Sequence, residues 1–253
     1  MIRIAIILVC TCTLASSLSA MVGGAPLAGE EAGRAVIMLT GSRGTFCSGV
    51  ALARDLVLTA AHCVLPGADY KLVEFDPARQ PVLKELATIA RHPGFDVNAV
   101  LRHRVTADVA LVKLGAPLTV RPARLAPEGV LVSAGDRFDV AGYGVAIRGD
   151  GKSGGIVRAA TLVATGQPGT LQIRLADAAS NGERAGLGAC TGDSGAPVYR
   201  EIGGALAVIG VVSWSTGPSL SDGCGGLTGV TPLMRYRVWI VEQALKMGSV
   251  LPP

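Results

Sequence analysis

The residue best suited to nucleophilic chemistry is Ser194, in the stretch ACTGDSGAPV at residues 189–198. Gly192 and Gly195, on either side of it, predict a tight turn. A serine hydroxyl is a weak nucleophile, so it needs a base within hydrogen-bond reach and a third group that orients the base. Without such partners the stretch is an ordinary surface loop, and its function therefore depends on what the rest of the chain supplies.

The chain has three histidines that could provide the base. His92, which precedes a proline, and His103, which lies between two arginines, are expected in solvated loops. His62 differs, because VLTAAHCV places it at the end of an apolar strand and beside Cys63. A disulfide at Cys63 would hold the backbone of His62, which suits a base whose geometry must be kept within about half an ångström.

Asp108 is the candidate for the orienting group. The stretch TADVALVKL places it directly before an apolar strand, whose side chains should exclude water from the carboxylate. Taken alone, Asp108 is better interpreted as a turn residue at the end of a strand. The three stretches together predict a triad of His62, Asp108 and Ser194.

The first twenty residues have the pattern of a secretory signal. MIRIAIILVCTCTLASSLSA contains Arg3, an apolar stretch from Ile4 to about Leu14, and small residues up to Ala20. The apolar run is too short for a good membrane span, and no later segment approaches the required length. A retained N-terminal anchor is the alternative. We expect residues 1–20 to be a signal peptide and the protein to be secreted or periplasmic, without a membrane association once the signal is removed.

The cysteine pattern suits an exported protein. Removal of the signal would take Cys10 and Cys12 with it and leave Cys47, Cys63, Cys190 and Cys224. Four cysteines allow three pairings, of which proximity along the chain favours Cys47–Cys63 and Cys190–Cys224. Closing the first loop, of about 15 residues, would stabilise the fold by roughly 3 kcal/mol. A zinc site is the alternative, but the chain has no C-x-x-C pair and no histidine cluster.

Composition and patterning indicate short strands joined by tight turns. Hydrophobic residues make up 49% of the chain, charged residues 17%, and glycines number 34. Apolar runs recur between turn residues and predict antiparallel strands in a barrel or sandwich. Examples are RAVIML, CSGVAL, LVLTAA, VALVKL, RFDVAGYGVAI, TLQIRL, APVY and LAVIGVVSW. Residues 114–129, rich in proline and polar residues, are the candidate linker between two halves.

One helix is expected near the end of the chain. Thr231 can cap it, Pro232 suits its first position and Gly248 can stop it. The side chains expected on its packed face are those of Tyr236, Ile240 and Ala244.

Charge and motifs exclude several other functions. Without Arg3, the chain has 22 lysines and arginines against 19 acidic residues, a formal charge of +3, and no basic stripe with interleaved aromatics. Nucleic-acid binding is therefore not expected. Glu74, Asp76 and Glu85 do not have the spacing of a calcium loop, and no cofactor motif is present, so neither a metal nor a cofactor is expected.

Several stretches, in the order His, Asp, Ser, together resemble the chymotrypsin-like (trypsin-type) serine proteases. The stretches are LTAAHC, ADVALVKL, GDSGAP, MVGG (21–24), FCSG (46–49), RHPGFD (91–96), VAGYG (140–144) and VVSWS (211–215). The resemblance runs from Met21 to the final helix. It implies an all-β fold of two six-stranded antiparallel barrels with a C-terminal helix. The peptidase domain would be 21–253, with His62 and Asp108 in an N-terminal barrel (21–120) and Ser194 in a C-terminal barrel (121–253).

The resemblance also implies a role for each residue. His62 would take the proton of Ser194, Asp108 would orient the imidazole, and the N–H groups of Gly192 and Ser194 would form the oxyanion hole. Asp193 would pair with a new α-amine at Met21, because MVGG stands where the family has IVGG. Almost no room is left for a propeptide, so signal cleavage after Ala20 would itself create the active terminus; cleavage one residue earlier is the alternative.

Substrate preference is the least defined part of this comparison. Gly188 occupies the position at the base of the primary pocket, where trypsin-type enzymes have an acid. Ser213, Trp214 and Ser215 resemble the segment that pairs with substrate and forms a pocket wall, and Ser215 replaces a usual glycine. Cys224 comes several residues late, so Asp222 cannot be aligned with the pocket. A small or apolar side chain is expected before the scissile bond.

The function expected from the sequence is that of a secreted serine endopeptidase. It would be a monomer acting on proteins or peptides, with protein protease inhibitors as further partners. An α/β-hydrolase esterase is disfavoured, because its nucleophile motif needs glycine where Ala196 stands and its triad follows the order Ser, acid, His. A catalytically silent binding protein on the same fold is the alternative, although such relatives usually lose a triad residue and none is lost here.

Overall fold

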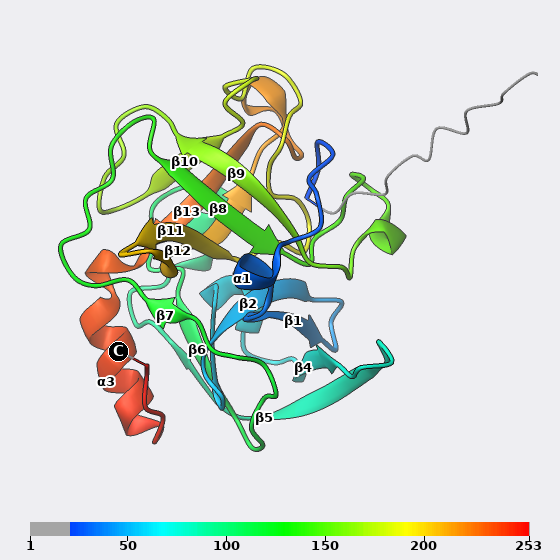
Figure 1. Ribbon diagram of the computed structural model, residues 1–253, viewed down its shortest axis with the longest axis vertical. Coiled ribbons are helices and arrows are strands. Elements are labelled where there is room, and N and C mark those ends of the chain that lie inside the picture. Colours follow the sequence, from blue (N-terminus) through cyan, green and yellow to red (C-terminus); the bar gives the residue numbers. More distant parts are fainter. Residues whose placement is uncertain (1–20, 253) are drawn as a thin grey trace, which may run out of the picture.

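The computed structural model describes residues 21–252, so the expected signal peptide lies outside the described residues. The first part of the chain forms a closed barrel of six antiparallel strands, in the order β1-β2-β3-β6-β5-β4 (Figure 1). Its strands are β1 (Val36–Gly41), β2 (Phe46–Ala53), β3 (Leu56–Thr59), β4 (Tyr70–Phe75), β5 (Pro81–Arg91) and β6 (Ala110–Leu114).

The second part of the chain forms another barrel. Six strands follow the order β11-β8-β9-β10-β13-β12, and a β11–β12 pairing closes the circle. They are β8 (Arg137–Gly142), β9 (Arg158–Ala164), β10 (Ile173–Ala176), β11 (Pro197–Ile202), β12 (Ala205–Ser215) and β13 (Leu227–Pro232). A two-residue strand, β7 (Arg124–Leu125), adds to β12 in parallel and lies inside the segment expected to link the two halves. The predicted fold of two six-stranded antiparallel barrels is confirmed.

Each barrel has its own interior core, and a third core lies between them. In β3, Val57 belongs to the core inside the first barrel, whereas Leu56 and Leu58 belong to the core shared with the second. The alternation of side chains along a strand explains this division, and all four residues of LVLT are therefore buried. Tyr199 of β11 and Ile240 near the C-terminus complete the shared core, which fixes the two barrels against each other.

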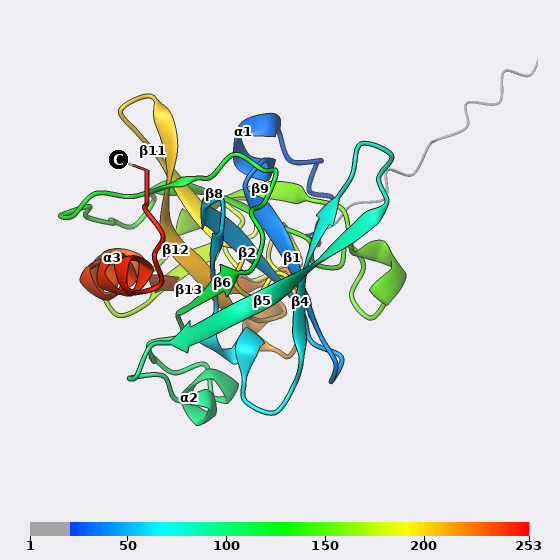
Figure 2. The ribbon, with the colours of Figure 1, turned by 90° about the horizontal axis from the view of Figure 1, so that it is seen from below.

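The described helices are short, except for the last. They are α1 (Glu30–Gly33), α2 (Val97–Leu101) and α3 (Arg237–Lys246), with 3₁₀ turns η1 (Ala61–Val64), η2 (Gly151–Ser153), η3 (Pro218–Leu220) and η4 (Leu233–Arg235). Figure 2 shows α3 beside the barrels, on the far side from the β4–β5 hairpin. None of the helices in residues 21–252 has the length and apolar character that crossing a membrane requires.

The start of the C-terminal helix was predicted too early. Thr231 and Pro232 are the last residues of β13, where they pair with Val211 and Gly210 of β12, and the α-helix begins at Arg237. Strand pairing therefore overrides the local capping pattern. The packed face is as predicted, because Tyr236, Ile240 and Ala244 are buried. Gly248 has the left-handed φ of +70° that favours glycine after a helix end.

The end of the chain is tied to the first barrel by Asp55. Its carboxylate accepts hydrogen bonds from Lys113 Nζ (2.5 Å) and Ser249 Oγ (2.8 Å). Burial alone would raise the pKa of Asp55, but the hydrogen bonds from Lys113 and Ser249 and the charge of Lys113 together lower it. A lowered pKa means that the ionised carboxylate stabilises the fold above its ordinary pKa of 3.8, and that this stabilisation is lost as the pH falls through the lowered value.

We expect Asp55→Asn to lower the free energy of unfolding by about 0.5–1 kcal/mol at pH 7, a modest effect because the pair is partly exposed and screened. The difference from wild type should shrink below pH 3.8. Urea unfolding at pH 7 and pH 2.5 measures both values. Asp222→Asn is the matched control, because Asp222 is exposed and forms no ion pair in the described part of the chain. An undiminished difference at pH 2.5 would contradict the assignment.

Candidate active site

His62 and Asp108 form a hydrogen-bonded pair at the edge of the first barrel. His62 lies in η1, directly after β3, and Asp108 lies two residues before β6, the neighbour of β3. The antiparallel pairing of these strands brings the two residues together, with His62 Nδ1 2.8 Å from Asp108 Oδ2. The Asp108 side chain is fully buried, whereas that of His62 is 20% exposed. The pair therefore has a sheltered acid and an accessible imidazole.

Two further donors fix the Asp108 carboxylate. The backbone N–H of His62 donates to Oδ1 (3.0 Å), and Ser213 Oγ of β12 donates to Oδ2 (2.5 Å). A carboxylate only accepts hydrogen bonds, so His62 Nδ1 must carry the proton that it shares with Asp108. The lone pair on Nε2 is then free to accept a proton. Ser213 comes from the second barrel, so this arrangement depends on the packing of both barrels.

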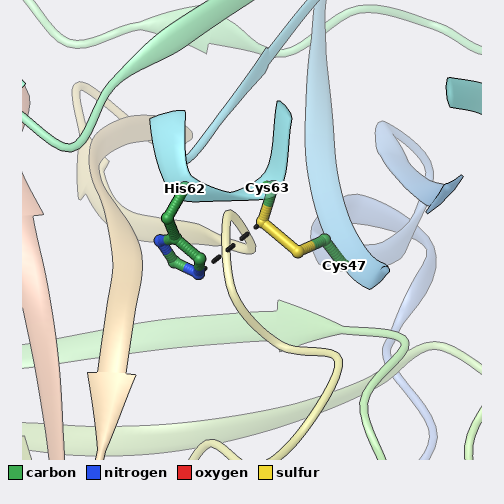
Figure 3. Close-up of side chains that lie close together, drawn as sticks. All are labelled: Cys47, His62 and Cys63. Atoms are coloured by element: carbon green, nitrogen blue, oxygen red, sulfur yellow. Dashed lines mark hydrogen bonds between the residues drawn. A yellow bond between two sulfur atoms is a disulfide. The ribbon is translucent and has the colours of Figure 1, made fainter. Parts of the chain in front are cut away.

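Both predicted disulfides are present, and one of them supports His62. Cys47 and Cys63 are bonded at 2.06 Å, and Cys190 and Cys224 at 2.00 Å. Figure 3 shows the His62 ring beside the first disulfide, with Nε2 3.8 Å from Cys63 Sγ. This sulfur carries no proton, so the approach is a packing contact. The bridge joins η1 to β2 and so limits movement of His62.

The disulfide also removes the donors that a metal would need. The side-chain nitrogen or sulfur atoms of Cys47, His62 and Cys63 lie within 4.8 Å of one another, a spacing that would suit a zinc ion. The two sulfurs are bonded to each other, so neither can act as a thiolate ligand. The imidazole alone is left, and one ligand does not form a structural or catalytic zinc site.

The loop of Ser194 is held by both barrels. Its carbonyl oxygen accepts a hydrogen bond from the backbone N–H of Ser48 in β2 (2.8 Å), and the N–H of Gly195 donates to Val212 of β12 (2.7 Å). Gly195 has φ of +80°, and a Cβ there would overlap Thr59 Oγ1. Only glycine therefore allows the loop to lie this close to the first barrel.

Ser194 lies near His62, although no hydrogen bond joins their side chains within residues 21–252. The Ser194 carbonyl oxygen is 3.6 Å from Cys63 Sγ, the same sulfur that His62 Nε2 approaches. Ser194 is partly exposed. A substrate-free site commonly has a loose nucleophile–base hydrogen bond that tightens when substrate is bound.

Two backbone donors beside the Ser194 hydroxyl have no partner in the described part of the chain. The N–H groups of Gly192 and Ser194 make no hydrogen bond there, although Gly192 is buried. Gly192 has φ of +96°, and its carbonyl accepts from Ser48 Oγ (2.8 Å), which orients the peptide. Buried N–H groups are nearly always paired, so an unpaired N–H at buried Gly192 is unusual and leaves a donor open to a bound group.

The Asp193 carboxylate lies against the backbone of Gly144 and Cys190. Asp193 is fully buried, and its carboxylate accepts from the backbone N–H groups of Gly144 and Cys190, each at 2.9 Å. A Cβ on Gly144 would overlap this carboxylate, so the close approach needs glycine. Burial raises the pKa of Asp193 to about 7, and the two backbone hydrogen bonds counteract this only in part. Within residues 21–252 no cation forms an ion pair with it.

Met21, the predicted partner of Asp193, is fully buried in the second barrel's core. The next residue, Val22, forms an antiparallel bridge with Gly188. Ala189, adjacent to the Cys190 whose N–H binds Asp193, is in the same core cluster as Met21. Met21 has φ of +50°, which is strained for a residue with a side chain.

Among the predicted pocket residues, Gly188 packs against Gly225, because a Cβ on it would lie 3.2 Å from Gly225 Cα. Sequence reasoning missed Thr228, which is fully buried and pairs with Ser215 across β12 and β13. Its Oγ1 accepts from the N–H of Ala189 (3.0 Å) and lies 3.6 Å from a Cβ placed on Gly188. The pairing of β12 with β13 identifies Thr228, because it places this residue opposite Ser215. In the sequence, the late position of Cys224 left the alignment of this segment open.

The other two histidines lie in loops, as predicted, but both contact aromatic rings. His92 is only partly exposed: its ring packs edge-on against Tyr236 and Trp239, each with centroids 5.0 Å apart, and burial lowers its pKa. His103 is exposed, as predicted, but its ring stacks on Trp214. Neither belongs to the His62–Asp108 pair.

Glu74 and Glu85, two of the three acidic residues that were not expected to bind calcium, have lysine partners. Glu74 lies 3.3 Å from Lys84 and accepts two hydrogen bonds from Thr119, and Glu85 forms an ion pair with Lys71. These carboxylates are thus engaged within the fold.

Two six-stranded antiparallel barrels, with a His–Asp pair and a glycine-bounded serine at their junction, have the architecture of chymotrypsin-like serine proteases. Residues 21–240 match the family model described as Trypsin. The chain is 28% identical over 239 residues to the vitellin-degrading protease of Bombyx mori, covering 88% of this chain and 84% of that protein. It is 33% identical over 231 residues to serine protease 56 of Homo sapiens, covering 81% of this chain and 36% of that protein. The chain therefore belongs to the trypsin family of serine proteases.

Proposed function

We propose that this protein is a serine endopeptidase that cleaves peptide bonds through a Ser194 acyl-enzyme. The proposal rests on one observation: the N–H groups of Gly192 and Ser194 have no partner within residues 21–252 and lie beside a hydroxyl near an imidazole that Asp108 orients. The experiment that tests it is covalent labelling with a serine-directed phosphonate, compared between wild type and Ser194→Ala.

The proposed reaction uses this chain's residues alone. Ser194 Oγ attacks the peptide carbonyl carbon while its proton passes to His62 Nε2, and the carbonyl electrons move onto the oxygen, which the N–H groups of Gly192 and Ser194 bind. The C–N bond then breaks, and His62 gives the proton to the leaving amine. Water then attacks the acyl carbon while its proton passes to His62. The C–O bond to Ser194 breaks, His62 returns the proton to Ser194, and the carboxylic acid product leaves. Asp108 stabilises the imidazolium at each stage without taking its proton.

We propose further that the active N-terminus is Met21. Holding Asp193 ionised at neutral pH costs on the order of 4 kcal/mol, at 1.36 kcal/mol for each pH unit between 3.8 and about 7. An α-amine at buried Met21 would supply the missing cation. Cleavage before Met21 would also remove the φ constraint on this residue, because a terminal residue has no preceding peptide plane.

Signal cleavage after Ala20 is the proposed source of that terminus, so the domain would be 21–253 with halves at 21–120 and 121–253. Secretion or export to a periplasm fits the two disulfides, which persist in oxidising compartments. The enzyme would act as a monomer, without a metal or cofactor, on protein or peptide substrates, and would be open to protein inhibitors.

The proposed primary pocket is shallow, with Gly188 at its base, Ser213–Ser215 along one wall and Thr228 across from Ser215. Two strand side chains facing each other narrow the space, so alanine or serine should be preferred before the scissile bond. Asp222 is exposed and forms no ion pair in the part of the chain described.

We expect Thr228→Gly to shift the preference towards large side chains. The ratio of kcat/KM for alanine to that for phenylalanine before the scissile bond should fall by roughly tenfold, in line with the usual effect of one or two methyl-sized groups in a pocket. Peptides that differ only at this residue measure the ratio. Thr170→Gly, in an exposed loop, is the matched control. An unchanged ratio would show that Thr228 does not limit the pocket.

A further inference from the structure

Residues Arg102, His103 and Arg104, here called the cationic loop, lie between α2 and Asp108. All three are exposed. Within residues 21–252, neither arginine side chain forms an ion pair or a hydrogen bond. Two permanent positive charges are therefore available to a ligand.

His103 attaches this loop to Trp214. The two rings stack with centroids 4.8 Å apart and planes 17° from parallel. Trp214 follows Ser213, whose hydroxyl binds the Asp108 carboxylate. The cationic loop therefore contacts Trp214, and Trp214 is adjacent in sequence to the residue that binds Asp108.

The backbone holds the loop in place. The N–H of His103 donates to Val100 (2.9 Å) and that of Arg104 to Ala99 (2.8 Å), both in α2. His103 has φ of +51°, a left-handed conformation that costs a residue with a side chain about 1–3 kcal/mol unless its surroundings impose it. These bonds and the ring stack impose it here, so the arginines on either side of His103 have fixed backbone positions next to the residue that contacts Trp214.

A further cation, Arg148, lies beside Gly223, which is hydrogen-bonded to Ser215. A Cβ built on Gly223 would lie 2.6 Å from Arg148 Cζ, so the guanidinium packs directly against this glycine. Gly223 is also the residue whose carbonyl accepts from Ser215 Oγ (3.2 Å). Asp222 is the exposed acid beside it, whereas Asp108 is buried and already bonded.

We propose that the cationic loop selects acidic substrates: it binds carboxylate side chains on the residues that precede the residue at the scissile bond. This rests on the proposed peptidase function, because a peptide paired with Ser213–Ser215 would extend past Trp214 and the loop. Exposed charge pairs each change affinity by a factor of about 1.5 to 5. If the two arginines act independently, they predict a preference of roughly two- to twenty-five-fold.

The test compares three peptides with alanine at the scissile bond and the same leaving group. The two to three preceding residues are glutamate, glutamine or lysine. Wild type should hydrolyse the peptides in the order Glu, Gln, Lys, with the differences mainly in KM, and high salt should reduce them. Arg102→Gln/Arg104→Gln should bring the Glu-to-Gln ratio close to one.

Two control variants separate the loop from general charge and from packing. Arg121→Gln/Arg137→Gln removes the same charge from exposed positions outside the site and should keep the preference. His103→Phe keeps an aromatic ring on Trp214 and should keep the preference for glutamate, whereas His103→Ala removes the ring and should weaken that preference.

Titration with the serine-directed phosphonate gives the concentration of active sites in each variant. An enzyme that is labelled and cleaves all three peptides equally would overturn the acidic preference and leave the peptidase proposal standing. Equal loss of preference in the Arg121/Arg137 control would also overturn it. A wild-type protein that is neither labelled nor active would instead overturn the peptidase proposal.

Discussion

Ser194→Ala is expected to abolish labelling by a serine-directed phosphonate and to lower kcat by roughly 10⁵–10⁶, as in other enzymes that use a serine triad. The reason is the removal of the atom that forms the acyl bond. Labelling is measured by intact mass, and kcat with an alanine-containing peptide. Ser133→Ala is the matched control, because Ser133 is exposed in the second half of the chain and should leave both measurements unchanged.

The double variant Ser194→Ala/His62→Ala distinguishes a triad from independent contributions. Residues that act as one catalytic unit are not additive, so the double variant should be no slower than Ser194→Ala alone. A further loss of many-fold would show that His62 acts separately. Absence of labelling in correctly folded, correctly processed wild type would favour the alternative of a catalytically silent binding protein on the same fold.

The second large effect is expected at the N-terminus. A chain that begins at Ala20 should be at least about 10²-fold less active than one that begins at Met21, because the amine would lie one residue away from Asp193. Gly192 and Ser194, the proposed oxyanion donors, flank Asp193, and loss of such a donor costs about 10²–10³ in rate. N-terminal sequencing defines each sample, and hydrolysis per phosphonate-titratable site compares them. Full activity of the chain beginning at Ala20 would contradict the proposal.

Asp193→Asn should cause a similar loss even when the chain begins at Met21. It keeps the shape of the side chain and removes its charge, so folding can be checked by thermal unfolding while activity is lost. Met21→Ile is the control, because it keeps both the amine and an apolar side chain in the buried position, and it should remain active.

The proposed ion pair also predicts a pH dependence. An α-amine has an ordinary pKa of about 8, and pairing with Asp193 raises it in the folded protein. The stabilisation is therefore complete below pH 8 and is lost as the pH rises through the raised value. Activity should fall on the alkaline side. The chain beginning at Ala20 should lack this fall, because its oxyanion hole is not organised at any pH.

Short stretches of sequence predict the candidate catalytic residues and the disulfides of this protein. VLTAAHCV, TADVALVKL and GDSGAP each combine a polar residue with apolar or glycine neighbours, and these local patterns predict where His62, Asp108 and Ser194 lie. Both disulfides follow from proximity along the chain. The two-barrel fold follows from the resemblance to a known family, because apolar runs alone leave a barrel and a sandwich equally open.

Local patterns were wrong where tertiary contacts override them. Thr231 and Pro232 pair with β12 and do not cap a helix. The reason is that strand pairing satisfies backbone polar groups, whereas the start of a helix leaves its first N–H groups without partners. His92 does lie in a loop, but the aromatic rings of Tyr236 and Trp239, about 145 positions away along the chain, cover part of its ring.

Sequence by itself determined the residue types that could carry the chemistry, their order along the chain and the two disulfides. Only the tertiary structure decided how they are supported: Ser213 donates to Asp108, Thr228 faces Ser215, and His103 stacks on Trp214. Each of these contacts joins segments from different strands or loops. Strand register and barrel packing set such contacts, and a one-residue shift in register would turn every side chain of a strand to its other face.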